Sequence, residues 1–140
     1  MADIALTATQ IGLVWPDDQE VYAWEAAVTI TAGQAVYINS NGKLDLADAN
    51  GSGTLQFAGI ALNGGGAGQT IDVIKRGALY GFTISGLAYF APVYLSNTAG
   101  SLADAAGTSS NVVGRVIPLN NTGTLTKVLW VNAQWSTVFS

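Results

Sequence analysis

The chain contains no cysteine and no histidine. Without cysteine, disulfide bonds and thiolate metal sites are excluded. Without histidine, the commonest general base and the commonest metal ligand are missing, and a serine–histidine–aspartate triad cannot form. We therefore expect a protein that is not an enzyme and that binds no metal or cofactor.

Charged residues are also scarce. They make up 10% of the 140 residues, against roughly 25% in a typical soluble domain, and the formal net charge is −4. Five basic residues, of which only Lys75 and Arg76 are adjacent, cannot form a stripe that tracks phosphates, so no nucleic-acid partner is expected. No apolar run approaches the about 20 residues of a membrane span, so no membrane partner is expected. A surface with few ions costs little to desolvate, which favours lasting contact with other proteins over a plain soluble β-domain.

Apolar side chains alternate along several segments, and 17 glycines separate these segments. This period of two is typical of strands, and turn signals every eight to twelve residues or so predict an all-β barrel or sandwich. Ser40-Asn41-Gly42-Lys43 predicts a hairpin with a type I′ turn. Stretches around Ala47 and Ala103 predict one helical turn each. The expected strand faces are formed by Tyr22, Trp24, Ala26, Val28 and Ile30, and by Ala78, Tyr80, Phe82 and Ile84.

Two segments, residues 30–77 and 87–133, carry the same motifs in the same order. VYINSNGKLDLADANG (residues 36–51) corresponds to VYLSNTAGSLADAAG (residues 93–107), and Gly59 corresponds to Gly114. The offset stays at 55–58 residues, from Val36/Val93 to Val73/Val128. Two copies are too few for a solenoid, so residues 21–140 are predicted to form a single pseudo-duplicated β domain.

Residues 1–20 lie outside this repeat. We interpret them either as an extended N-terminal arm, which has no strand partner in its own domain and docks on another molecule, or as a frayed end. Trp15 and Trp135, near the ends of the chain, fit an interface, where tryptophan is enriched, or packing back onto the barrel. Trp24 and Trp130 are predicted to be core or half-buried residues. The candidate interface residues are therefore Ile4, Leu6, Ile11, Leu13, Trp15 and Trp135.

The carboxylates do not form a convincing catalytic pair. Asp17, Asp18 and Glu20 cluster beside Pro16 and are interpreted as solvated turn charges. Asp48 and Asp104 each precede a glycine-containing turn, where aspartate commonly accepts a backbone N–H. A glycosidase would need two carboxylates facing each other across a groove, and nothing in the sequence predicts that.

Two loops superficially suggest ligand binding. NGGGAGQT (residues 63–70) lacks the lysine of a phosphate-binding loop and does not open a helix. DLADAN (residues 45–50) offers oxygen ligands for calcium but lacks the later bidentate glutamate. We interpret the first as a flexible loop and the second as a polar turn.

The duplicated unit resembles the small β-rich decoration, or cement, proteins of tailed-phage heads. In that family a Gly-x-x-Val-Tyr strand leads to a Gly-x-Leu turn, then to Gly-x-Ala at a strand start, and then to a strand ending in glycine. The matches lie within about residues 26–133, and the second copy departs from the pattern where Phe90 replaces the glycine. The matches in the first copy are Gly33, Val36-Tyr37, Gly42-x-Leu44, Gly59-x-Ala61 and Val73 to Gly77. Those in the second copy are Pro92-Val93-Tyr94, Gly100-x-Leu102 and Gly114-x-Val116.

The resemblance implies a compact β-barrel or β-tulip domain that stabilises a phage head by bridging capsomers. It also implies a location on the outer capsid surface of the virion, the major capsid protein as partner, a homo-trimer on the shell and no enzyme activity. An alternative is a receptor- or glycan-binding virion appendage, because exposed aromatic rings also bind sugars. A wall-degrading hydrolase is the third possibility, and the missing histidine and cysteine argue against it.

Overall fold

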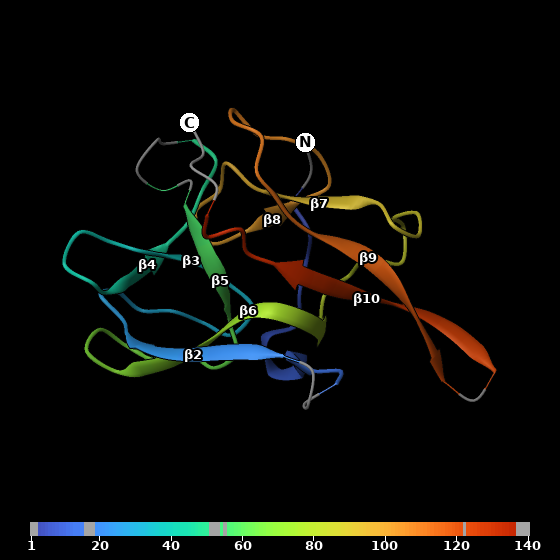
Figure 1. Ribbon diagram of the computed structural model, residues 1–140, viewed down its shortest axis with the longest axis horizontal. Coiled ribbons are helices and arrows are strands. Elements are labelled where there is room, and N and C mark those ends of the chain that lie inside the picture. Colours follow the sequence, from blue (N-terminus) through green and yellow to red (C-terminus); the bar gives the residue numbers. More distant parts are fainter. Residues whose placement is uncertain (1–2, 16–18, 51–53, 55, 122, 137–140) are drawn as a thin grey trace.

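The protein is all-β, as the hydrophobic alternation predicts. The computed structural model describes residues 3–15, 19–50, 54, 56–121 and 123–136, and over these residues an antiparallel sheet curls into a half-barrel (Figure 1). The only helical element in these ranges is a single 3-10 turn, η1 (Ala8–Gln10). The strands are β1 (Gly12–Leu13), β2 (Glu20–Glu25), β3 (Ala35–Ile38), β4 (Leu44–Leu46), β5 (Phe57–Ala61), β6 (Thr70–Tyr80), β7 (Pro92–Leu95), β8 (Leu102–Ala103), β9 (Val112–Asn121) and β10 (Thr124–Asn132).

The two halves of the sheet have the same strand order. The order across the sheet is β4-β3-β5-β6-β10-β9-β7-β8, so that β6 and β10 meet in the middle, and β1 and β2 add to β6. Val36 lies opposite Gly59 in the first half, and Val93 lies opposite Gly114 in the second, with a register shift directly after each pair. This order agrees with the repeated motifs, while an origin of the halves as two copies of one unit stays a prediction.

The two corresponding glycines are required by close approach of the backbone. A Cβ atom at Gly59 would overlap the carbonyl oxygen of Ile74 on β6, and one at Gly114 would overlap the carbonyl oxygen of Trp130 on β10. Glycine is the residue that allows such an approach. The spacing of glycines that stands out in the sequence is therefore a packing requirement at these two positions.

The hairpin predicted at residues 40–43 connects β3 to β4, but its turn type differs from the prediction. Of its residues only Gly42 has a positive φ, of +78°, whereas a type I′ turn needs two such residues. The Gly42 N–H donates to the carbonyl oxygen of Asn39 at 3.0 Å, and the Asn39 side chain accepts from Lys43 N–H at 3.1 Å. The helical turns expected around Ala47 and Ala103 are also wrong, because Ala103 lies in β8 and residues 47–49 are irregular.

The core draws on both halves of the chain. Its main cluster includes Ile60, Ile74, Leu95 and Leu129, none of which is measurably exposed. A smaller cluster contains Val36 and residues of β4 to β6, and Trp24 of β2 packs against it. Burial of each such aliphatic side chain contributes about 1.5–3 kcal/mol, so this shared core is the main force joining the halves.

Residues 3–15 of the N-terminal segment pair with the rest of the same domain. β1 is antiparallel to the end of β6, where Leu13 lies opposite Leu79. The Ile4 N–H donates to the carbonyl oxygen of Leu102 at 2.8 Å, and both Ile4 and Leu13 pack against the main core. The expectation that this segment has no strand partner in its own domain is therefore wrong for residues 3–15. That it contacts a neighbouring molecule stays a prediction.

Candidate interaction surfaces

Three large aromatic side chains meet on the surface, and we call Tyr22, Trp24 and Trp135 the aromatic surface. Alternation along β2 places Tyr22 and Trp24 on one face of the strand, where their rings stack with centroids 5.4 Å apart and an interplanar angle of 10°. Trp135 follows β10 and lies 5.1 Å from Tyr22 and 6.0 Å from Trp24, tilted against both. Tyr22 and Trp135 nevertheless remain 41% and 42% exposed. Such rings offer a large contact area that loses little conformational entropy on binding.

Trp135 is held in place by a hydrogen bond from its ring N–H and by a cation over its ring. Its Nε1–H donates to the carbonyl oxygen of Ala58 at 3.0 Å, and the Lys75 ammonium lies 4.8 Å from the ring centroid. Lys75 Nζ in turn lies 3.3 Å from Glu20 Oε2, and the other oxygen of this carboxylate, Oε1, pairs with Arg76. A small hollow of about 180 Å³ opens beside the ring, and Ile38 and Gln56 line it. The aromatic surface is thus preorganised and bordered by charged groups.

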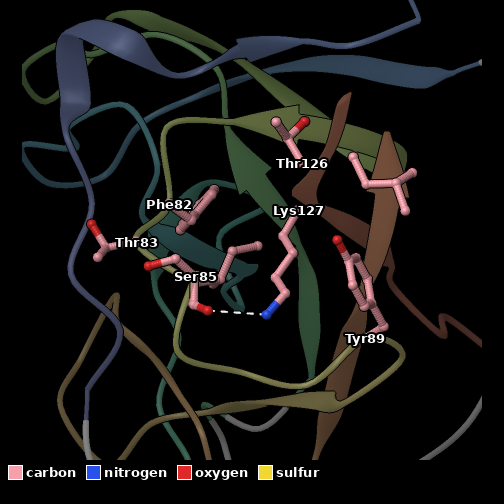
Figure 2. Close-up of a pocket in the computed structure, with 8 residues that line it drawn as sticks. Phe82, Thr83, Ser85, Tyr89, Thr126 and Lys127 are labelled. Carbon is pink, nitrogen blue, oxygen red and sulfur yellow. Dashed lines mark hydrogen bonds between the residues drawn. The ribbon is translucent and has the colours of Figure 1, made fainter. Parts of the chain in front are cut away.

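A second hollow lies at the β9–β10 hairpin, and we call it the hairpin pocket. Its volume is about 420 Å³, and Figure 2 shows its lining. Lys127 reaches from β10 across the pocket and donates to the carbonyl oxygens of Ser85, at 3.0 Å, and Leu87. The same ammonium lies 5.0 Å from the Tyr89 ring centroid. The pocket is lined by Phe82, Thr83, Ile84, Ser85, Tyr89, Leu125, Thr126 and Lys127.

The loop beside this pocket contains the only described non-glycine residue with a positive φ. Phe90 has a φ of +62° and is 64% exposed. Arg115 holds it there, because its Nη1–H donates to the Phe90 carbonyl oxygen at 2.8 Å and its guanidinium lies 4.5 Å from the ring centroid. Gly33, the corresponding residue of the first half, also has a positive φ, of +93°. The second half therefore has phenylalanine where the first half has glycine, but it keeps the left-handed backbone. That conformation costs a non-glycine residue about 1–2 kcal/mol.

Asp48 has a role in local structure. Asp48 accepts the Asn50 N–H and the Thr54 hydroxyl, both at 2.9 Å, which confirms its predicted turn role. Among the described residues no three histidine, cysteine, aspartate or glutamate side chains gather as a metal site would require. Asp17 and Asp18 lie outside the described residues. Desolvation, followed by the charges of Asp45 and Asp48, raises the pKa of the Tyr37 hydroxyl above its ordinary value of 10.0.

The structure separates the six residues that the sequence suggests as an interface. Ile4 and Leu13 are partly buried against the core, and Leu6 and Ile11 lie against Gly33. Trp15 is 42% exposed, and its carbonyl oxygen accepts from the Gln19 side chain. Trp135 alone joins the aromatic surface.

Sequence reasoning missed several exposed side chains. It grouped Tyr22 with Trp24 and Ala26 on one strand face and did not predict that Tyr22 is exposed, as it is on β2, which pairs with β6. It also missed the exposed Tyr89, Phe90 and Leu125 around the hairpin pocket. Only the polar neighbours of Tyr22, including Glu20 and Glu25 on the same strand, could have indicated its exposure.

No protein-family description matches the chain, and no curated protein matches it either. No helix in the described part of the chain has the length and apolar character needed to cross a membrane. The function is therefore inferred from the aromatic surface and the hairpin pocket.

Proposed function

We propose that the protein is a structural capsid-decoration, or cement, protein. It binds the outer surface of a phage head, contacts the major capsid protein and stabilises the shell by bridging capsomers, acting as a homo-trimer and without catalysis. It has neither a nucleic-acid nor a membrane partner. The observation that carries this proposal is the presence of two exposed apolar surfaces in separate parts of one domain.

The distance between the two exposed apolar surfaces suits a protein that bridges two neighbours. The β9–β10 hairpin extends to one end of the long axis, whereas β2 and β5, which position the aromatic surface, lie in the other half of the molecule (Figure 1). Tyr22 and Trp135 are exposed at the first surface, and Tyr89, Phe90 and Leu125 at the second. A domain with two such surfaces can contact two neighbours at once, and many weak contacts on a shell sum to a strong hold.

The low charge supports the same proposal. With 10% charged residues, most of the surface can be desolvated without stripping water from ions. Glu20 pairs with Lys75 and Arg76, and the Lys75 ammonium lies over the Trp135 ring of the aromatic surface. These charged groups lie beside the exposed rings, as polar groups do at the border of many protein interfaces.

Co-sedimentation with expanded but undecorated phage heads tests the proposal. We expect saturable binding and greater resistance of the decorated heads to heat or osmotic shock. Tyr22→Ala should weaken binding about tenfold or more if the aromatic surface is an energetic centre of the contact. Tyr80→Ala is a matched control, because Tyr80 is similarly exposed, at 44%, but lies outside both surfaces. Absence of co-sedimentation at micromolar protein would refute the capsid role.

A receptor- or glycan-binding appendage is the second candidate. The observation that favours it is the aromatic surface itself, because exposed tyrosine and tryptophan rings beside Glu20 and Arg76 could stack on a sugar and bond its hydroxyls. Titration of tryptophan fluorescence with host-wall glycans distinguishes the two. Saturable quenching that Trp135→Ala removes, without binding to heads, would favour the appendage.

A further inference from the structure

The β9–β10 hairpin has two outer edges of different character. Val116 on β9 directs its backbone groups away from β10, since its N–H donates to Ala91 and its carbonyl oxygen accepts from Phe90. Alternation along a strand gives Pro118 the same orientation. Pro118 has no N–H, so the outer edge of β9 lacks a donor at this position. Proline is one of the ways in which proteins block strand addition to an exposed edge.

The corresponding edge of β10 is not blocked. Leu129 pairs with Leu79 of β6, and Ala133 N–H donates to the Lys75 carbonyl oxygen. Leu125 and Lys127 have the same orientation as these two residues, but the β6–β10 ladder ends at Leu129. Among the hydrogen bonds of the described residues, none joins the outward backbone N–H or carbonyl of Leu125 or Lys127 to another group. This stretch presents an open edge about 7–10 Å long.

The open edge lies along the hairpin pocket. Leu125 and Lys127 both line that pocket, together with residues 82–85 that follow the end of β6 at Tyr80. In the described part of the chain, Lys127 is the only charged residue among those that line the pocket. Its ammonium has three donors, of which two are used by the carbonyl oxygens of Ser85 and Leu87. One donor and a full positive charge remain for an anionic group.

We propose that the hairpin pocket binds an extended peptide segment of a partner protein. The segment adds as a strand to β10 at Leu125 and Lys127 and places an aspartate or glutamate side chain beside the Lys127 ammonium. The residue two positions away on the same face of the peptide is apolar and contacts Leu125 and Tyr89. Main-chain hydrogen bonds then supply affinity, and the two side chains supply specificity. The proposal does not depend on a capsid as the partner.

A second copy of the chain fits this edge less well. Twofold pairing of two β10 edges would bring the two Lys127 side chains close together, and like charges across a strand pair are destabilising. An acidic segment instead complements the single cation. Charge therefore selects the acidic peptide over self-association.

Selection of displayed random peptides against the full-length protein tests the proposal. Enriched peptides should contain an acidic residue two positions from an apolar one, and their amide signals and those of Leu125 to Lys127 should shift in NMR spectra. Leu125→Pro removes an outward N–H, as Pro118 already does on β9, and should weaken binding at least about tenfold. Leu125→Val keeps that N–H and should bind within about twofold of the parent protein. Lys127→Met should remove the preference for acidic peptides over neutral analogues.

Three outcomes would overturn the proposal. The first is failure of any peptide to be enriched. The second is equal binding to the Leu125→Pro and Lys127→Met variants, provided that each variant melts cooperatively. The third is a concentration-dependent dimer in sedimentation equilibrium that Leu125→Pro abolishes, because the edge would then belong to a second copy.

Discussion

Gly114→Ala should strongly destabilise the protein, because the added methyl group has no room. A Cβ atom at this position would overlap the carbonyl oxygen of Trp130 and lie 2.9 Å from its carbonyl carbon and 3.2 Å from the Cα atom of Val131. All three are backbone atoms of β10, so no side-chain rotation relieves the overlap. The strands β9 and β10 would have to separate where Gly114 pairs with Val131.

The expected loss can be estimated from its two parts. Overpacking of a well-packed site costs about 1–3 kcal/mol. Loosening one or two neighbouring hydrogen bonds of the ladder adds about 1 kcal/mol each. A decrease of about 3 kcal/mol in the free energy of unfolding is therefore expected, and Gly59→Ala should have a similar effect through the Ile74 carbonyl group.

Urea unfolding followed by tryptophan fluorescence measures this difference. Gly86→Ala is the matched control, since a Cβ atom there meets nothing within 4 Å, and its effect should stay within about 0.5 kcal/mol. In thermal unfolding, Gly114→Ala should lower the midpoint by about 10 °C. A Gly114→Ala protein as stable as the Gly86→Ala protein would refute the steric argument. If Gly59→Ala left the stability unchanged while Gly114→Ala lowered it, positions 59 and 114 would not be equivalent.

Three other substitutions test separate parts of the molecule. Because the pKa of Tyr37 is raised in the fold, its stabilising effect is complete below about pH 10 and is lost as the pH rises through the raised value. Tyr37→Phe should therefore flatten the alkaline decrease in unfolding free energy, with Tyr94→Phe as the control for loss of a hydroxyl. Trp135→Phe should cost about 1 kcal/mol in urea unfolding through the lost bond to Ala58, and an unchanged stability would contradict that bond's role. Leu13→Ala should cost about 1–2 kcal/mol if β1 is an integral strand, whereas no loss would indicate a frayed end.

The strand pattern was predictable because one physical signal dominates this sequence. Apolar alternation and glycine spacing indicate the all-β fold, and the positions of Val36, Val93, Gly59 and Gly114 follow the pairing that the structure contains. The hairpin at Gly42 was predicted for the same reason. Its turn type was not, because Asn-Gly is compatible with several turns and the loop length selects among them.

The interaction surfaces were largely hidden from sequence reasoning. Aliphatic residues such as Ile4 and Leu13 in an unduplicated segment suggested an arm, yet the same residues complete the core of their own domain. A local pattern cannot show which strand edge is still free to pair. Nor could it show that Lys127 lies across a pocket, because its contacts at Ser85 and Leu87 are about 40 residues away and depend on the tertiary fold.

The position of β6 and β10 at the centre of the sheet has a consequence for how the chain folds. Each half can complete its own pairing first, as β3 to β6 and as β7 to β10, before the seam between β6 and β10 closes. Such a non-local seam forms slowly relative to hairpins. While it is open, the first half of one molecule offers the same surface to its own second half and to that of a neighbour. Exchange of halves between molecules is thus the characteristic misfolding route of this architecture, and the chain between β6 and β7 is its hinge.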